Sequence, residues 1–244
     1  MSKIFQSITD VPTTPLFGEL INPLSPTYRE FKSWLMDKRS TPKLYIVEPT
    51  ADETPEWYLS PDFRYVFSRS FHKRDVVGAK WGDEELWSKG YEAKETDPKA
   101  PMLREIIAEI LQHNGLELDT LYRSAFNVTL PRANVPGTPK GIALPHVDDN
   151  FPHLVMLIYL NTCSGDTILT DRLLNNNEGT YRWPFKDFVQ NSPQHESECE
   201  ILERIPPVAD KVVIFDGKRY HYNECPLPGE PHRLALVATF SLKR

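Results

Sequence analysis

Cysteine is scarce in this sequence. Its 244 residues include only three, Cys163, Cys199 and Cys225, and no two of them form a CxxC pair. An odd number of widely spaced cysteines excludes a disulfide framework of the kind that holds small secreted domains together. We therefore expect reduced thiols in a cytosolic protein.

Long apolar runs are absent as well. No stretch approaches the roughly 18 uninterrupted apolar residues that a membrane-spanning helix needs. The first residues, MSKIFQSITDVPTT, lack the apolar centre of a secretory signal. These two absences predict a cytoplasmic protein that does not enter a membrane.

Positive charge is also in short supply. Lysine and arginine number 28 against 34 aspartates and glutamates, so the net charge is −6 and the pI is about 5.7. A surface of that sign repels a phosphate backbone, and the basic stretch 73–80 is too short to reverse it. Nucleic acid is therefore not expected as a partner, although a local basic groove is compatible with this charge.

Glycine is half as frequent as proline, with 11 residues against 22. Prolines break helices and stay out of central strands, so this excess predicts many short elements joined by rigid turns. The composition, 40% hydrophobic and 25% charged, is that of an ordinary globular protein. The length suffices for one sizeable core.

The first part of the chain predicts a mixture of helices and short strands. Ser25 and Pro26 suit the cap and first position of a helix that runs to about Lys38. The clearest helix covers 101–113, where apolar residues recur at helical spacing and Gly115 follows the end. Weaker signals predict strands at 44–47 and 65–67 and a short helix at 83–88.

After Gly115 the apolar pattern changes from helical to alternating. The segments that read as strands are 122–130, 142–148, 153–160, 166–169, 200–205, 211–215, 219–222 and 233–242. Turn signals such as Pro136-Gly137 and Asp216-Gly217 separate several of them. Many short strands with frequent turns predict a β-sandwich or jelly roll, with the helices packed on its outside.

We therefore expect a mainly β protein with flanking helices, an α+β fold. Residues 1–115 are expected to form an N-terminal α/β region that packs on a core formed by 116–244. The stretch at about 171–199 shows no clear period and reads as a flap or insertion.

A candidate metal-binding pair occurs in the segment Pro145-His146-Val147-Asp148. On a strand, residues two apart project from the same face, so His146 and Asp148 are expected to lie side by side. An imidazole beside a carboxylate is two thirds of the facial triad that holds non-heme iron(II). The pair alone is a weak signal, because such a short motif also occurs by chance.

A third ligand is available in the segment 215–221, where an apolar strand and a tight turn are followed by His221. Distant strands of a jelly roll can meet at one rim, so the long gap in sequence is no obstacle. His232 is the main rival, but it adjoins Arg233 on a strand and should point to the opposite face from it. The alternation of strand residues therefore favours His221.

The other histidines are weaker candidates. His113 lies at the polar end of a helix and His195 in the expected flap, so both should be solvated. His72 precedes two basic residues, which disfavour a cation site. His153 could line the pocket.

Arg233 opens an otherwise apolar strand. A buried guanidinium needs an anion, and it meets a carboxylate through two parallel hydrogen bonds. One possible partner is the neighbouring Glu230; the other is the carboxylate of a ligand. The presence of a metal motif nearby favours the ligand.

Taken in order, these residues resemble the pattern of the Fe(II)/2-oxoglutarate-dependent oxygenases, an HxD pair followed by a distal histidine and a basic residue about ten positions later. The nearest likeness is to the prolyl-hydroxylase-like branch and related small viral and bacterial oxygenases. Residues 157–161, Leu-Ile-Tyr-Leu-Asn, resemble a strand of that branch, and Gly165-Asp166-Thr167 resembles its G-x-T segment. The resemblance covers roughly 122–240.

Some features depart from the family. The spacing from His221 to Arg233 is slightly long, and Ala235 stands where some plant-type members carry serine. The terminal strand also lacks the second arginine of the nucleic-acid dealkylase branch, which tells against DNA or RNA repair.

The resemblance implies a double-stranded β-helix core, the jelly roll of cupin-like proteins. It implies that His146, Asp148 and His221 hold Fe(II), and that Arg233 and Tyr159 bind the distal carboxylate of 2-oxoglutarate. Asn127, on the strand before the HxD pair, is a further candidate contact with the cosubstrate.

The implied reaction consumes dioxygen and 2-oxoglutarate, releases succinate and carbon dioxide, and hydroxylates an unactivated C–H bond, with ascorbate as a stimulant. Halogenating relatives lack the carboxylate ligand, so Asp148 favours hydroxylation. The expected substrate is a prolyl or other amino-acid side chain in a peptide, a protein or a free amino acid. Aromatic residues of the expected flap, Tyr181, Trp183 and Phe185, could line its site or simply pack.

Two other classes stay open. A jelly-roll protein could bind a metal or ligand, or serve a structural role, without turnover. A zinc hydrolase could use the same three ligands, but it leaves Arg233 unexplained.

Overall fold

The structure, a computed structural model, describes residues 25–37, 58–59, 66–73, 93–131, 146–149, 151–174 and 200–243. Within these ranges the protein is mostly β, with two helices, α1 (Pro26–Met36) and α3 (Ala100–His113). The strands are β1 (Tyr58–Leu59), β2 (Val66–Lys73), β3 (Lys94–Glu95), β4 (Leu118–Thr129), β5 (Leu154–Tyr159), β6 (Thr167–Leu173), β7 (Ile201–Ile205), β8 (Val212–Asp216), β9 (Arg219–Asn223) and β10 (Arg233–Leu242).

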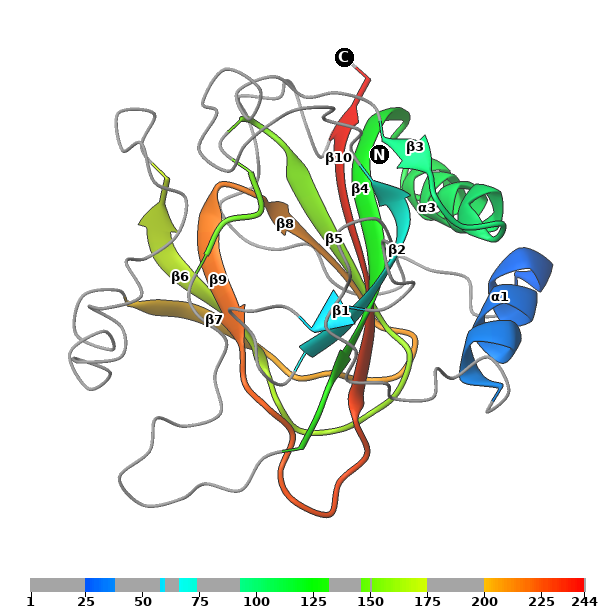
Figure 1. The fold of residues 1–244 in the computed structure, drawn as a ribbon. Helices are drawn as coiled ribbons and strands as arrows, with labels where there is room; N and C mark the ends of the chain where they lie inside the picture. Colours follow the sequence, from blue (N-terminus) through cyan, green and yellow to red (C-terminus); the bar gives the residue numbers. More distant parts are fainter. Residues whose placement is uncertain are drawn as a thin grey trace.

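The strands form two antiparallel sheets. The large sheet has the order β1-β2-β4-β10-β5-β8, with β3 also paired to β2, and the small sheet has the order β7-β6-β9. Chain neighbours β5 and β6 lie in different sheets, as do β8 and β9, so the chain passes repeatedly from one sheet to the other. Figure 1 shows the small sheet on one side of the large sheet and both helices on the other side.

The helices cover the outer face of the large sheet. Tyr28, Phe31 and Leu35 are the buried residues of α1, and their spacing places them on one side of the helix. They join the buried face of α3 and outward residues of β10 such as Leu236 in one apolar cluster. This packing explains why both predicted helices form where the sequence places them.

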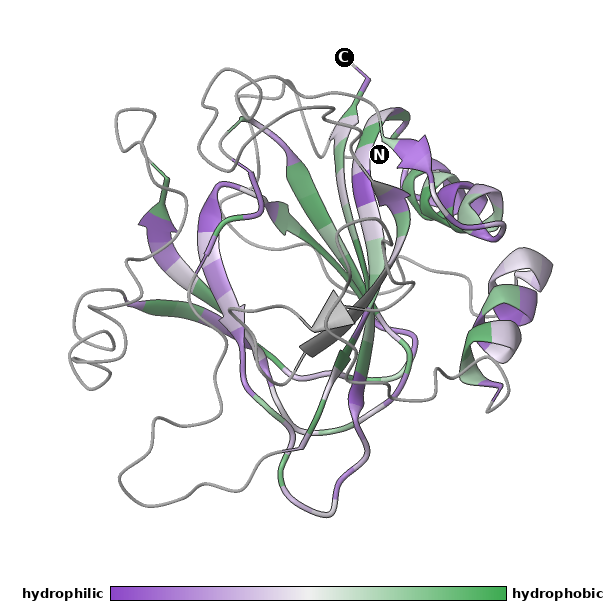
Figure 2. Ribbon diagram, in the orientation of Figure 1, coloured by the Kyte–Doolittle hydropathy of each residue, from purple (hydrophilic) through white to green (hydrophobic). Residues whose placement is uncertain are grey.

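The inner face of the large sheet meets the small sheet. Alternate residues of β10, beginning with Arg233, Ala235 and Val237, point inward, while Leu234 and Leu236 point outward. The inner apolar cluster combines residues from both sheets: Val155, Leu157, Tyr159, Leu169, Ile205, Val213, Phe215, Ala235 and Val237. In Figure 2 apolar colour dominates β5 and β8, whereas much of β9 is hydrophilic.

Most strand predictions are confirmed in position. The last strand, predicted at 233–242, is β10 (Arg233–Leu242), and the predictions at 153–160, 200–205 and 211–215 differ from β5, β7 and β8 by only one residue at one or both ends. The predicted strand at 65–67 is the beginning of β2, which continues to Lys73.

The predicted strand at 142–148 is wrong over its described part. Only His146 takes part in β pairing, as an isolated bridge, and Asp148 lies at a bend. Local alternation suggested a strand, but a strand needs a partner along its length, which this sequence pattern does not specify.

Several predictions lie outside the described residues: the strand at 44–47, the helix at 83–88, residues 142–145, and all of the expected flap apart from 171–174. The division at about residue 115 stays a prediction. Neither of the two described helices is long and apolar enough to cross a bilayer.

Candidate metal centre

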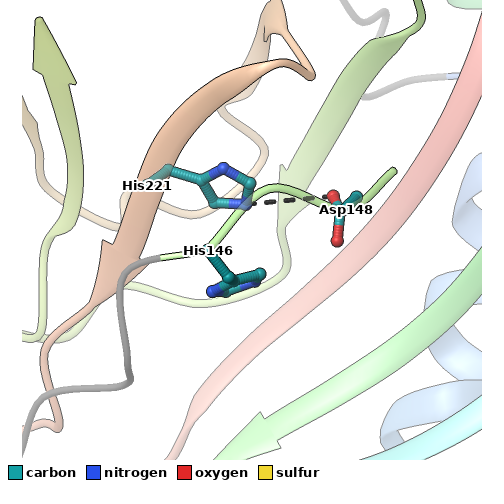
Figure 3. A group of neighbouring side chains, drawn as sticks. All are labelled: His146, Asp148 and His221. Carbon is teal, nitrogen blue, oxygen red and sulfur yellow. Dashed lines mark ion pairs between the residues drawn. The ribbon is translucent and has the colours of Figure 1, made fainter. Parts of the chain in front are cut away.

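Three side chains predicted as metal ligands converge between the sheets. His221 lies in the middle of β9, and His146 pairs with it as an antiparallel bridge. The amide of each residue donates to the carbonyl of the other, at 3.0 and 2.9 Å. Figure 3 shows the two imidazoles and the Asp148 carboxylate around one small volume, with Asp148 approaching from the side of the large sheet.

The ligand atoms of His146, Asp148 and His221 all lie within 4.8 Å of one another. His221 Nε2 is 3.8 Å from Asp148 Oδ2, and the ring centres of the two histidines are 4.6 Å apart. The side chains of His221 and Asp148 are only 10% and 8% exposed. His232, the rival in sequence, is exposed and lies outside this group.

The backbone fixes which nitrogen of His221 faces the carboxylate. Nδ1 of His221 lies 3.0 Å from the carbonyl oxygen of Arg219. Because a carbonyl can only accept, Nδ1 carries the hydrogen and Nε2 presents its lone pair toward Asp148. A hydrogen bond from the remote ring nitrogen is the usual way in which proteins orient a metal-binding histidine.

The local charges keep both groups ready to bind a cation. Burial, aided by His146, lowers the pKa of His221 from 6.5 to about 4, so its imidazole is neutral at pH 7. Burial alone would raise the pKa of Asp148, but His221, Arg123 and His146 outweigh it and lower that pKa to about 2. The site therefore offers a neutral His221 imidazole and an ionised carboxylate.

The residues fit a divalent transition metal. Asp148 Oδ2 is buried and has no hydrogen-bond partner among the described residues, although buried carboxylate oxygens normally have one. A metal ion between Oδ2 and the histidine nitrogens would supply it. Ligands bonded at about 2.1 Å lie roughly 3 Å apart, so small rotations of these side chains would complete the site. Two nitrogens and one carboxylate suit iron(II), and also zinc.

Arg233 begins β10 and is buried, with 4% of its surface exposed. Its Nη2 donates to Thr167 Oγ1 at 2.6 Å, and its guanidinium lies over the ring of Tyr159, with 5.2 Å between their centres. Nε has no partner among the described residues. Glu230, the alternative partner considered from sequence, instead accepts hydrogen bonds from the amide and hydroxyl of Ser164.

Tyr159 and Thr167 complete the polar group around Arg233. Their hydroxyls are 2.7 Å apart and both residues are buried. Two hydroxyls joined by one hydrogen bond retain one further hydrogen to donate. This hydrogen and the N–H of Arg233 Nε could both be donated to a bound anion. We define Tyr159, Thr167 and Arg233 as the anion cluster.

The anion cluster and the metal ligands face the same interior. On β6 and β9, Leu169 pairs with His221 and Thr167 pairs with Asn223, so the two groups are two strand positions apart. That step is about 7 Å along a strand. A short molecule with an acidic group at each end could contact both.

Asn127 lies in the same row of the large sheet as Tyr159, since both pair with Ala235 of β10. The register therefore places Asn127 on the inner face, where it is half-buried. Its predicted contact with the cosubstrate stays a prediction.

The remaining histidines take separate positions. His113 is exposed, as expected, and His195 lies outside the described residues. His72 is buried and its Nδ1 lies 2.7 Å from Ser124 Oγ. His153 is buried against Gly217, with Nδ1 2.7 Å from the carbonyl oxygen of Phe151, and does not belong to the metal group.

Sequence reasoning missed the roles of Thr167 and Arg123. Thr167 follows Gly165 by two positions at the start of a strand, and strand alternation from Leu169 could have placed it inward. Arg123 Nη1 lies 3.4 Å from Asp148 Oδ1, a contact that needs the position of Asp148 at a bend. No local signal in the sequence indicates that contact.

No family model and no curated protein matches this chain. Solved structures to which it is similar are 2-oxoglutarate and iron-dependent enzymes. One is an oxidoreductase of the 2OG-Fe(II) oxygenase family from Burkholderia pseudomallei, with 12% identity, a TM-score of 0.41, and coverage of 75% of this chain and 70% of that one. Another is a prolyl-4-hydroxylase from Pseudomonas putida, with 16% identity, a TM-score of 0.33 and coverage of 73% of each chain.

A third is an α-ketoglutarate-dependent carbocyclase from nogalamycin biosynthesis, with 16% identity and a TM-score of 0.43. The likeness covers 75% of this chain and 66% of the carbocyclase. One architecture can support many reactions, so function depends on the side chains of the site.

Proposed function

We propose that this chain is an Fe(II)- and 2-oxoglutarate-dependent dioxygenase that hydroxylates an unactivated C–H bond. His146, Asp148 and His221 would hold the iron, and Arg233 would bind the distal carboxylate of 2-oxoglutarate. The strand order supports a double-stranded β-helix core, because four strands of the large sheet, β4-β10-β5-β8, face the small sheet completed by the bridge at His146.

The observation that carries the proposal is that Arg233 is buried and has no carboxylate partner among the described residues. The three metal ligands alone would also suit a zinc hydrolase or a simple metal-binding protein. A guanidinium buried beside them without a carboxylate partner among the described residues implies an anionic ligand in the same interior.

The position of the anion cluster supports 2-oxoglutarate as that ligand. 2-Oxoglutarate carries a carboxylate at each end, and a keto group lies beside one of them. One end could bind the metal while the other accepts hydrogen bonds from Arg233 and from the Tyr159–Thr167 pair. We propose that Asn127, which lies on the inner face in the same row as Tyr159, contacts the carbon chain between the two carboxylates of 2-oxoglutarate.

When bound, the iron would supply the activation of dioxygen coupled to oxidative decarboxylation of 2-oxoglutarate. The chain's own residues orient the reactants and limit water. His221 presents Nε2 because Arg219 O holds Nδ1, and Phe215 of the inner apolar cluster packs against the His221 ring. We propose a prolyl or other amino-acid side chain as substrate, in a peptide, a protein or a free amino acid.

Binding of Fe(II) and 2-oxoglutarate together provides the direct test. Under anaerobic conditions we expect a weak visible charge-transfer band when both are added and none with either alone. Arg233→Gln should keep metal binding but lower the affinity for 2-oxoglutarate by about 30-fold, since it removes a charged hydrogen-bond donor contributing about 2 kcal/mol.

His232→Gln is the matched control for His221→Gln, because the two histidines are rivals in sequence and only His221 joins the metal group. Loss of the band in His232→Gln but not in His221→Gln would overturn the ligand assignment. If the band forms but no substrate tried gives oxygen-dependent succinate release, a binding protein without turnover would be favoured.

A further inference from the structure

Four strands have an end on the side of the interior that holds Arg233. In the large sheet, Thr129 is the last residue of β4 and Arg233 is the first residue of β10. In the small sheet, Thr167 is the first residue of β6 and Asn223 is the last residue of β9. These four residues therefore mark one end of the space between the sheets.

The four residues are joined in a closed ring. Thr129 pairs with Arg233 within the large sheet. Asn223 pairs with Thr167 within the small sheet. Residues paired in this way point to the same face, with Cβ atoms about 5 Å apart. Two contacts join the sheets: Arg233 Nη2 donates to Thr167 Oγ1 at 2.6 Å, and Asn223 Nδ2 lies 3.5 Å from Thr129 Oγ1. We call these four residues the end ring.

The end ring closes the interior. Thr129 and Thr167 are each only 1% exposed, Arg233 is 4% exposed, and Asn223 is half-buried. Side chains that lined an open passage would be accessible to solvent. The end ring therefore forms a floor beneath the anion cluster, and a ligand held by Arg233 cannot extend far beyond it.

The metal group fixes the other end of the same space. His221 precedes Asn223 by two positions on one face of β9, which is about 7 Å along the strand. An acid that binds the metal with one carboxylate and Arg233 with the other is therefore bounded at both ends. One more methylene group would press its distal carboxylate against the end ring.

We propose that Thr129 and Asn223 limit the length of the cosubstrate, so that the site accepts a five-carbon 2-oxo diacid and rejects its six-carbon homologue. The inference rests on the proposed function and assigns specificity to two residues outside the anion cluster. Arg233 attracts the distal carboxylate of a diacid of any length, whereas the neutral side chains of Thr129 and Asn223 limit how far that carboxylate can reach. A closely packed site discriminates against one extra methylene by roughly 10- to 200-fold.

Calorimetry on the full chain loaded with Mn(II) tests the limit without turnover. The ligands are 2-oxoglutarate and 2-oxoadipate, which has one more methylene between its carboxylates. We expect 2-oxoglutarate to bind at least ten times more tightly. If neither acid binds, the proposed function and the inference both fail. If both bind with equal affinity, only the inference fails.

Variants locate the limit. Thr129→Ser and Asn223→Ala remove side-chain volume from the end ring, so each should reduce the preference for 2-oxoglutarate over 2-oxoadipate at least fivefold. Thr129→Val is the matched control, because it keeps the volume of the side chain. It should retain the preference even if the affinity for both acids falls. Thr120→Ala, near the other end of β4, should change neither affinity.

An unchanged preference in both Thr129→Ser and Asn223→Ala would overturn the inference, because the limit would then lie elsewhere. An equal reduction in Thr129→Val and Thr129→Ser would also overturn it, since side-chain volume would not be the cause. The thermal transition of each variant shows whether it is folded. Thr129→Ser removes a single methyl group, so it still decides if Asn223→Ala does not fold.

Discussion

At the scale of single residues, Asp148 interacts with different groups through its two carboxylate oxygens. Its Oδ1 faces Arg123 and its buried Oδ2 faces the histidines. The same carboxylate therefore neutralises a cation of the large sheet and completes the metal group. Its low pKa, about 2, follows from these neighbours and keeps it ionised at any physiological pH.

Asp148→Asn should remove metal binding while leaving the fold intact. The amide preserves the size of the side chain but is a poor ligand, so we expect Mn(II) affinity to fall by roughly 100-fold or more. Calorimetry measures the change. Asp119→Asn, at an exposed position on β4, is the control, and equal losses in both variants would contradict the assignment.

The pKa of His221 makes the metal-free protein sensitive to acid. Because this pKa is about 4 in the folded state and 6.5 when exposed, the unfolded chain binds the proton more readily. Folding stability should therefore fall as pH decreases from about 6.5 toward 4, by up to about 3 kcal/mol from this group. The lowered pKa of Asp148 also makes folding stability fall as pH decreases, but only below about pH 3.8, the ordinary pKa of the group.

Urea denaturation at pH 7 and pH 5, with a chelator present, measures this dependence. His221→Asn, which keeps a donor for Arg219 O but does not titrate, should show a smaller loss between the two pH values than the unmodified protein. His232→Asn should behave like the unmodified protein. An unchanged pH dependence in His221→Asn would refute the assignment.

Gly217 is required because a side chain at this position would collide with a neighbouring residue, not because its backbone adopts a conformation that only glycine tolerates. A Cβ built there would lie 2.0 Å from Nε2 of His153, whose buried ring is held by Phe151 O. Gly217→Ala should destabilise the protein by about 1–3 kcal/mol in urea denaturation. In a His153→Ala background the same substitution should cost much less, and an equal cost in both backgrounds would show that the ring is not the obstacle.

At the scale of elements, the start of β10 depends on a side chain that lies two residues after the end of β5. Asn161 Nδ2 donates to His232 O at 2.7 Å, and Asn161 Oδ1 accepts from Leu234 N at 3.0 Å. These two backbone groups flank Arg233. Asn161 therefore fixes the point at which the guanidinium enters the interior.

Asn161→Ala should weaken 2-oxoglutarate binding without changing metal binding. We expect the affinity for 2-oxoglutarate to fall three- to tenfold. Loss of the hydrogen bonds that orient Arg233 should cost about 1 kcal/mol of binding free energy, while Arg233 itself remains. Calorimetry with Mn(II) measures both ligands. Asn161→Asp, which can still accept from Leu234 N, should show a smaller effect, and a loss of metal affinity in Asn161→Ala would instead indicate general distortion.

The sequence predicted elements well where apolar residues follow a helical period or a continuous run. α1 and α3 lie close to where helical periodicity placed them, because one side of each helix is buried against the outer face of the large sheet, and β10 lies where a continuous apolar run placed it, because both of its faces are buried. The pattern could not distinguish a strand from an isolated bridge at His146. Pairing depends on β9, which is distant in sequence.

The predicted and the missed parts of the site differ in a similar way. His146, Asp148 and His221 were predicted from residue type and order, and they do converge. Arg123 was not predicted, because its contact with Asp148 depends on strand register and on the bend at Asp148. Residue type alone does not reveal those features.

At the scale of the whole molecule, the proposed ligands would join the two sheets. His221 and Thr167 belong to the small sheet, whereas Arg233 and Tyr159 belong to the large one. A metal and cosubstrate bound between them should raise the thermal midpoint. At ligand concentrations about 100 times Kd, each contributes about 2.7 kcal/mol.

Thermal melts with Mn(II), with and without 2-oxoglutarate, measure these increments. A chelator should reverse both, since the cosubstrate would bind through the metal. Arg233→Gln should retain the increment from the metal and lose most of that from 2-oxoglutarate. Stabilisation by 2-oxoglutarate in the presence of chelator would contradict binding through the metal.

The reciprocal backbone pairing of His146 with His221 also bears on which ions the centre can accommodate. If both imidazoles bind the metal, the distance between their donor nitrogens would be held nearly constant by the antiparallel pair of backbone hydrogen bonds. Asp148, at a bend, is the adjustable donor. Divalent ions of different radius should therefore be accommodated mainly by movement of one carboxylate, with both nitrogen donors in place.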